Sequence, residues 1–160
     1  MDWSVALPNI WFLLITILFT GFFVLEGYDF GVGVLAQVLG KTDEEKRVYF
    51  NTIGPFWDAN EVWLLTGGGA MFAAFPIWYG KLFSGYYIAF VLMLVALILR
   101  GVSFEFRGKL GDNRTWIKSY DIAMFVGSLL PPVLWGVAVA NFMTGANLDA
   151  KKNLLDGFLG

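Results

Sequence analysis

Residues 8–25, PNIWFLLITILFTGFFVL, carry no charge and are almost wholly apolar, and this stretch decides the fold class. A helix needs roughly 20 such residues to cross a hydrocarbon core of about 30 Å, whereas strands of soluble domains are far shorter. The apolar run resumes after a short acidic interruption, and one helix over residues 8–39 would be about 48 Å long. Such a helix must tilt, project from the membrane, or break near Gly27, Gly31 and Gly33.

Three further apolar segments are long enough to span a membrane, over residues 56–78, 82–104 and 122–142. Lipid offers no partner to backbone N–H and C=O groups, so segments of this kind are helical. The sequence therefore predicts an all-α, polytopic integral membrane protein with a four-helix transmembrane bundle. Residues 144–160 are predicted to be a polar, then mixed, tail that reads like a chain cut before its next helix.

The composition agrees with a protein that lives in lipid. Hydrophobic residues make up 58% of the chain, charged residues only 15%, and the mean hydropathy is +0.64. The chain has no histidine and no cysteine, which are the usual ligands of haem iron and of transition metals. We therefore expect no haem or metal ion to be ligated by this chain. No basic block is long enough to neutralise a run of phosphates, so nucleic acid is not an expected partner.

The basic residues indicate an orientation in the membrane. Seven lie between the first and second or between the third and fourth predicted helices, and three lie on the other side. The first group is Lys41, Lys46, Arg47, Arg107, Lys109, Arg114 and Lys118, and the second is Lys81, Lys151 and Lys152. Because basic loops stay in the cytoplasm, the N-terminus is predicted on the non-cytoplasmic side.

Four carboxylates lie within or beside the predicted spans, where ionisable side chains are costly and are functional candidates by default. Glu26 and Asp29 are three residues apart, as are Asp58 and Glu61, so each pair shares a helix face. The first two spans are antiparallel, so the four acids are expected to gather near the cytoplasmic side. Carboxylates crowded in a low-dielectric site can retain protons, as a proton relay requires. Alternatively, Asp58 and Glu61 interact favourably with the dipole at the start of their helix, and Glu26 and Asp29 reach the lipid headgroups.

Three other features bear on the spans. Residues 54–64, GPFWDANEVWL, combine two tryptophans, an asparagine and two acids, so this face should meet another helix, a lipid-like ligand or a chain of waters. Arg100, about 10 Å from the cytoplasmic end of its predicted helix, either reaches the interface or balances the buried acids. In the last span, Pro131 and Pro132 predict a kink, and Gly136 with Ala140 predicts tight helix packing.

Six stretches, in order along the chain, resemble the signature stretches of subunit II of the cytochrome bd ubiquinol oxidases. They are GYDFGVG (27–33), GPFWDANEVWL (54–64), GGAMFAAFP (68–76), FSGYY (83–87), RGVSFEFR (100–107) and GSLLPP (127–132). The resemblance covers nearly the whole chain, and several ordered blocks are far more specific than any single glycine pattern.

The resemblance implies a longer subunit in the bacterial inner membrane with two pseudo-symmetric four-helix bundles, of which this chain is the first half. In that family subunit I carries haems b558, b595 and d, subunit II ligates none, and some members hold a structural quinone. The implied partners are subunit I, a small single-helix accessory subunit, membrane lipid and quinone. The implied reaction of the complex is the electrogenic oxidation of quinol by O2, with protons taken from the cytoplasm.

The resemblance assigns no catalytic residue to this chain but does assign a proton path. Asp58 is the position that the motif match places on the path itself. The other residues assigned to it are Trp57, Asn60, Glu61, Glu26, Asp29 and Arg100. Two alternatives remain open. The chain is a purely structural partner whose charges join helices, or it is an independent transporter or channel.

Overall fold

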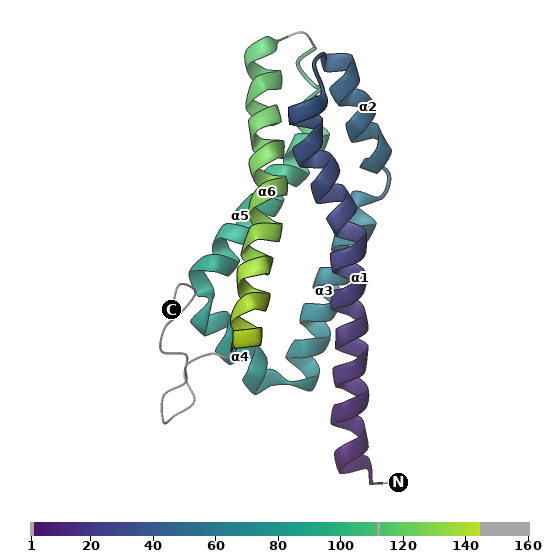
Figure 1. The fold of residues 1–160 in the computed structure, drawn as a ribbon, viewed down its shortest axis with the longest axis vertical. Coiled ribbons are helices and arrows are strands. Elements are labelled where there is room, and N and C mark those ends of the chain that lie inside the picture. The colour runs from purple at the N-terminus through teal and green to yellow at the C-terminus, as the bar shows by residue number, and fades with distance from the viewer. Residues whose placement is uncertain (1, 112, 145–160) are drawn as a thin grey trace.

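The computed structural model describes residues 2–111 and 113–144, and every regular element in this part of the chain is an α-helix. The helices are α1 (Trp3–Leu39), α2 (Asp43–Ile53), α3 (Trp57–Ala74), α4 (Pro76–Gly85), α5 (Tyr87–Phe106) and α6 (Arg114–Thr144). Figure 1 shows α1, α3, α5 and α6 running lengthwise, with α2 near one end and α4 near the other. The all-α prediction is confirmed. The predicted tail after Thr144 lies outside the described residues.

α1 is one unbroken helix of 37 residues, about 55 Å long. The Asp2 carboxylate caps it by accepting a hydrogen bond from the Ser4 amide at 3.1 Å. The helix therefore begins five residues before the predicted start at residue 8, and of the three alternatives for its length, a break at the glycines is absent. Gly27 faces open space. A glycine need not break such a helix, because lipid offers its backbone no alternative hydrogen-bond partner.

α2 is a helix in a segment that was predicted to be a loop. Thr42 Oγ1 accepts a hydrogen bond from the Glu45 amide at 3.2 Å, and Glu45 Oε2 accepts one from the Thr42 amide at 3.4 Å. This reciprocal arrangement is a capping box, which satisfies donors that the first turn leaves unpaired. The signal was present in the sequence as Thr42 followed three residues later by Glu45.

The predicted helix over 56–78 divides at Pro76, which begins α4. Proline has no N–H to continue α3 and disfavours helical geometry at the residue before it. Phe75 accordingly leaves the helix, with φ −134° and ψ 61°. The third predicted span consequently begins at Tyr87 rather than at residue 82.

Three helices, α1, α5 and α6, are long and apolar enough to cross a membrane by length and composition. The prediction of four such spans therefore holds for three of them. α3 has 18 residues, but its polar residues and glycines reduce its hydropathy. The polar members of its first turns are Asp58, Asn60 and Glu61.

The helices pack in a chain of neighbours, α5 against α6, and α1 against both α3 and α6. Three apolar clusters follow one another along the molecule. They are Ile15, Met71, Leu82, Tyr86 and Ala89 near α4, then Phe22, Phe30, Met93, Leu97 and Leu134, then Ala36, Phe50 and Met124 near α2. Gly136 meets no described helix, so the tight packing predicted there stays a prediction.

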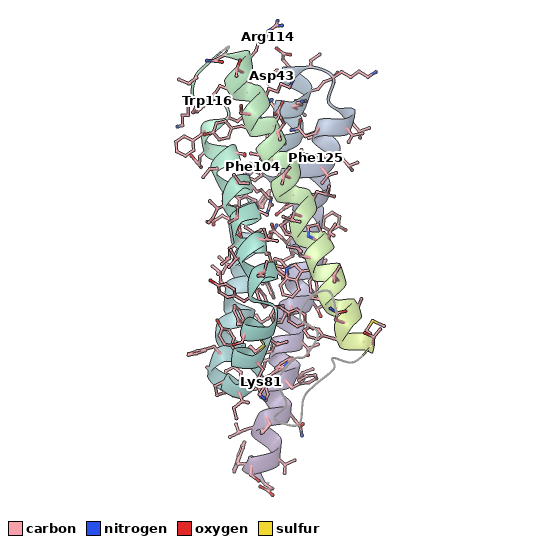
Figure 2. All side chains as sticks on the ribbon, turned by 90° about the vertical axis from the view of Figure 1, so that its left-hand side faces the viewer. Asp43, Lys81, Phe104, Arg114, Trp116 and Phe125 are labelled. Atoms are coloured by element: carbon pink, nitrogen blue, oxygen red, sulfur yellow. The ribbon has the colours of Figure 1, made fainter. Side chains whose placement is uncertain are left out.

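The two ends of the molecule differ in their polar residues. Figure 2 shows Asp43, Arg114 and Trp116 near one end and Lys81 near the other. We call the first the α2 end and the second the α4 end. Both predicted basic loops lie at the α2 end, because α2 and the α5–α6 connection are there (Figure 1).

Candidate functional site

A buried arginine forms the centre of the polar interior. Arg100 lies on α5, six residues before the end of that helix, and its side chain is 1% exposed. Its Nη1 donates to Glu26 Oε1, and its Nη2 lies 3.9 Å from Asp29 Oδ2. Both carboxylates belong to α1, one turn apart, and both are buried. The ion pairs therefore join α5 to α1 in the interior, where an unpaired charge would be costly.

α3 adds a neutral donor to this arrangement. Asn60 Nδ2 donates to Asp29 Oδ2 at 2.8 Å, so the Asp29 carboxylate receives polar contacts from two other helices. Glu61, the next residue, is half-buried. We call Glu26, Asp29, Asn60 and Arg100 the Arg100 cluster.

Aromatic rings surround the Arg100 guanidinium. Its central carbon lies 4.8 Å from the ring centroid of Phe30, 5.7 Å from that of Phe104 and 5.9 Å from that of Trp57. The rings of Trp57 and Phe104 stack on each other at 5.0 Å. Cations are attracted to aromatic faces, and this attraction is larger where water is excluded. The rings thus stabilise the cation and form a wall between it and the α2 end.

Glycines allow α6 to close the other side of the cluster. A Cβ on Gly127 would stand 2.6 Å from the Ala96 carbonyl oxygen, so α6 approaches the α5 backbone as closely as a glycine permits. Gly33 makes a similar approach between α1 and Ser128 of α6. Gly27 and Gly31 of α1, by contrast, face open space.

Some buried polar atoms of the cluster have no hydrogen-bond partner after these contacts are made. Among the described residues, Glu26 Oε2 and Arg100 Nε and Nη2 are buried and make no hydrogen bond. Two carboxylates also face a single guanidinium, so the cluster is net negative when every member is ionised. In a low-dielectric interior such an excess charge is best removed by retaining one proton.

The residues that the resemblance assigns to a proton path do not all lie together in the structure. Glu26, Asp29, Asn60 and Arg100 come together, and Trp57 contacts Arg100. Asp58, the residue expected at the centre, is exposed on the first turn of α3. Asp58 and Asn60 are two residues apart, about 200° around the helix, so they face opposite ways. The expected gathering of four carboxylates thus holds for the two on α1 and for the half-buried Glu61, which interacts electrostatically with Arg100 and Glu26, while Asp58 lies outside it.

A second polar group lies at the α2 end, and the sequence did not predict it. Asp121 of α6 accepts from Arg107 Nε at 2.7 Å and from Lys46 Nζ at 2.9 Å. Arg107 Nη2 also donates to Asp43 at 2.6 Å, and Gln37 accepts from Lys46 Nζ at 2.7 Å. Burial alone would lower the pKa of Arg107, but its bonds to Asp121 and Asp43 outweigh burial and raise that pKa. Arg107 is therefore a permanent cation.

A cavity of about 400 Å³ lies between these two groups. Its lining residues are Arg47, Phe50, Asn51, Gly54, Trp57, Ser103, Phe104, Glu105, Arg107 and Gly108. Trp57 and Phe104 belong both to this cavity and to the aromatic wall around Arg100. The same two rings thus border the cavity and lie beside the Arg100 guanidinium.

Comparison with known proteins explains the resemblance of the sequence blocks. The family model for cytochrome bd terminal oxidase subunit II matches residues 7–160. The chain belongs to this family. Subunit 2 of the cytochrome bd ubiquinol oxidase of Bacillus subtilis (strain 168) is 56% identical over 149 residues, which is 93% of this chain and 44% of the relative.

Two other subunits of the family show the same pattern of coverage. Subunit 2 of the cytochrome bd-I ubiquinol oxidase of Escherichia coli (strain K12) is 44% identical over 96% of this chain and 40% of its own length. The probable cytochrome oxidase subunit 2 of Haemophilus influenzae is 50% identical over 85% of this chain and 36% of its own length. The chain therefore spans less than half the length of the relatives it matches.

The cytochrome bd family implies haems in the complex, but the residues of this chain do not fit a haem site. The chain contains neither histidine nor cysteine. Met71, Met93 and Met124 are buried in the apolar clusters. Within residues 2–111 and 113–144, no group of three or more His, Cys, Asp or Glu side chains could hold a metal ion.

Proposed function

We propose that this chain is the N-terminal part of subunit II of a cytochrome bd-type terminal quinol oxidase, and that its Arg100 cluster carries protons. The complex would oxidise quinol, reduce O2 to water and take the protons from the cytoplasm, which makes turnover electrogenic. Haems b558, b595 and d would be held by subunit I. A small single-helix subunit, lipid and quinone complete the proposed partners.

One observation carries the proton role. Glu26 and Asp29 are buried around Arg100, with a buried carboxylate oxygen left unbonded among the described residues. A membrane protein retains such groups at a cost, and they generally serve a pathway or a contact within the protein. A carboxyl that shares one proton with its neighbour can take a proton from one side and release it to the other. Arg100 limits the cost of the ionised state through Coulomb attraction.

The path would run from the α2 end through the cavity of about 400 Å³ and past the Trp57–Phe104 pair to Glu26. Asp58 is proposed as a further relay position on the outer face of α3, where its exposure requires a polar neighbour in the membrane. Subunit I is the proposed neighbour. Glu61, half-buried one turn further on, would extend the same face.

The test replaces Glu26 by Gln in the full-length protein, within its membrane complex, and measures quinol oxidation alongside haem absorption. Loss of turnover at normal haem content is expected, because Gln keeps the shape but cannot exchange the proton. Glu44→Gln is the matched control, since Glu44 is exposed on α2. Unchanged turnover with Glu26→Gln would contradict the proton role, and the same comparison with Asp58→Asn tests that position separately.

A second candidate function has its own support. The Arg100–Glu26 ion pair joins α5 to α1, as expected of a structural subunit whose buried charges connect helices. In that case Glu26→Gln would reduce assembly and haem retention, while any intact complex would keep its turnover. The transporter alternative relied on intramembrane charges and on glycine-broken helices, and the continuity of α1 removes the second of these supports.

A further inference from the structure

The cavity of about 400 Å³ at the α2 end is open to its surroundings, and its rim is polar. Arg47 and Asn51 of α2 and Glu105 of α5 line the cavity and are exposed. Gly54 and Gly108 also line it and are exposed, and they add no side chain to the opening. A ligand can therefore enter the cavity without any movement of the helices.

The rim offers a ligand one charge of each sign. Arg107 lines the cavity too, but it is buried and is engaged by ion pairs with Asp43 and Asp121. The Arg47 side chain is 54% exposed, and its only described ionic contact is the shared Asp43 carboxylate at 3.2 Å. Glu105 makes no ion pair with any described residue. The charges available to a ligand are therefore the Arg47 guanidinium and the Glu105 carboxylate.

These two charges lie near each other across the opening. A Cβ on Gly108 would stand 3.9 Å from Arg47 Nη2, so the arginine reaches from α2 towards the end of α5. Glu105 precedes Gly108 by three residues and lines the same cavity. Asn51 follows Arg47 by four residues, on the same face of α2, and adds an amide donor. The rim can thus bind a phosphate at Arg47 and Asn51 and a cation at Glu105.

The inner end of the cavity is aromatic. Phe50 meets the Phe104 ring edge to face at 6.3 Å, and Phe104 stacks on Trp57 at 5.0 Å. Figure 2 shows Phe104 further from the α2 end than Asp43. The cavity therefore becomes less polar with depth, which suits a ligand whose charged groups stay at the rim and whose methylene groups point inward.

The cavity lies at the depth of lipid headgroups. α5 is long and apolar enough to cross a membrane, and it ends at Phe106, between the cavity residues Glu105 and Arg107. The end of a spanning helix lies where the hydrocarbon core gives way to the headgroups. Phe56 and Phe106, each next in sequence to a cavity residue, are 60% and 46% exposed. They offer apolar surface to acyl chains beside the polar rim.

We propose that this cavity binds the headgroup of an aminophospholipid from the surrounding bilayer, with its phosphate at Arg47 and Asn51 and its primary ammonium at Glu105. Phosphatidylethanolamine carries this headgroup. A purely anionic headgroup would place negative charge against Glu105, and a quaternary ammonium has no N–H to donate to that carboxylate. The lipid site does not rest on the proton role of the Arg100 cluster. Ammonium and phosphate groups both exchange protons with water, so an occupied rim is compatible with that role.

The experiment measures lipid binding to the full-length protein in its membrane complex. The complex is stripped of lipid in detergent and titrated with phosphatidylethanolamine, phosphatidylcholine or phosphatidylglycerol with identical acyl chains, and native mass spectrometry counts the lipids bound. Other lipid sites contribute equally to every variant. The difference between a variant and the unmodified complex therefore isolates this site.

One molecule of phosphatidylethanolamine is expected to bind about tenfold more tightly than the other two lipids. Arg47→Gln should weaken that binding about tenfold, because the phosphate loses its cation. Glu105→Gln should abolish the preference, and Glu105→Lys should reverse it in favour of phosphatidylglycerol. Both residues are exposed, so these changes should leave the fold intact. Arg114→Gln and Glu44→Gln, which change exposed charges outside the cavity, are the matched controls and should not alter binding.

Equal affinities of the three lipids for the unmodified complex would overturn the proposal, and a subunit that covers the cavity in the complex would give this result. Variants at Arg47 and Glu105 that bind phosphatidylethanolamine as the controls do would overturn it as well. Soluble phosphoethanolamine is added as a competitor in a further arm. Displacement of the lipid by an equal concentration of this compound would show that the acyl chains contribute nothing, and the assignment to a bilayer lipid would then be wrong.

Discussion

Gly127 of α6 lies directly against Arg100 of α5, so that a Cβ on the glycine would stand 2.8 Å from both the Arg100 amide nitrogen and its Cβ. This close approach fixes the α5 backbone at Arg100, whose side chain lies at the centre of the Arg100 cluster. Tight backbone contact between membrane helices typically depends on small residues of this kind.

Gly127→Ala is therefore expected to separate α5 from α6 and to destabilise the protein by about 1–3 kcal/mol, the usual cost of overpacking. Thermal unfolding in detergent measures the loss. Gly136→Ala is the matched control on the same helix, because a Cβ there meets open space. Equal unfolding temperatures for the two variants would contradict the close contact.

Arg100→Gln is expected to destabilise the protein by about 3–5 kcal/mol, because it leaves buried carboxylates without their counter-charge. Combining it with Glu26→Gln should recover part of that loss, since one of the two unpaired acids is then neutral. Denaturation of the single and double variants measures the coupling. Strictly additive losses would show that the pair does not interact, and Arg114→Gln, an exposed arginine, should have little effect.

Asn60→Ala removes the donor to Asp29 Oδ2 and is expected to cost about 1–3 kcal/mol, because a buried acceptor loses its partner. Under the proposed function the same variant should slow turnover at unchanged haem content. Asn9→Ala serves as the control, since Asn9 is exposed near the start of α1. A loss of stability no greater than that of the control would argue against the hydrogen bond.

Thr42→Ala removes one half of the capping box and is expected to weaken α2 by about 1 kcal/mol. Amide hydrogens of α2 should then exchange several-fold faster, as hydrogen exchange with mass spectrometry can measure. Thr52→Ala is a suitable comparison, because Thr52 is exposed and its hydroxyl bonds only to the Tyr49 carbonyl oxygen of its own helix. Indistinguishable exchange in the two variants would show that the cap does not stabilise α2.

The helical fold followed from the apolar runs, because spans of that length have no other stable form in lipid. Two details were available in the sequence and were missed. Thr42 with Glu45 marks the start of α2, and Pro76 marks the boundary between α3 and α4. The segment that holds Thr42 and Glu45 was predicted to be a loop, and Pro76 lay inside one long predicted span.

The interior of the site was predictable only in part. Spacing alone placed Glu26 and Asp29 on one face, and they do meet Arg100. The rotation of α3 about its own axis depends on packing against α1, so sequence could not show that Asn60 faces inward and Asp58 outward. Asp121 joins residues far apart in the chain, and no spacing rule connects them.

The continuity of α1 has a mechanical consequence. Asp29 of the Arg100 cluster and Gln37, which contacts Asp121 and Lys46, lie on this one continuous helix, eight residues apart and therefore about 12 Å along its axis. A rod without a hinge between two attachment points transmits axial sliding and rotation instead of absorbing them. A movement of α1 at Asp29 therefore also moves Gln37, without any change of secondary structure between the two residues.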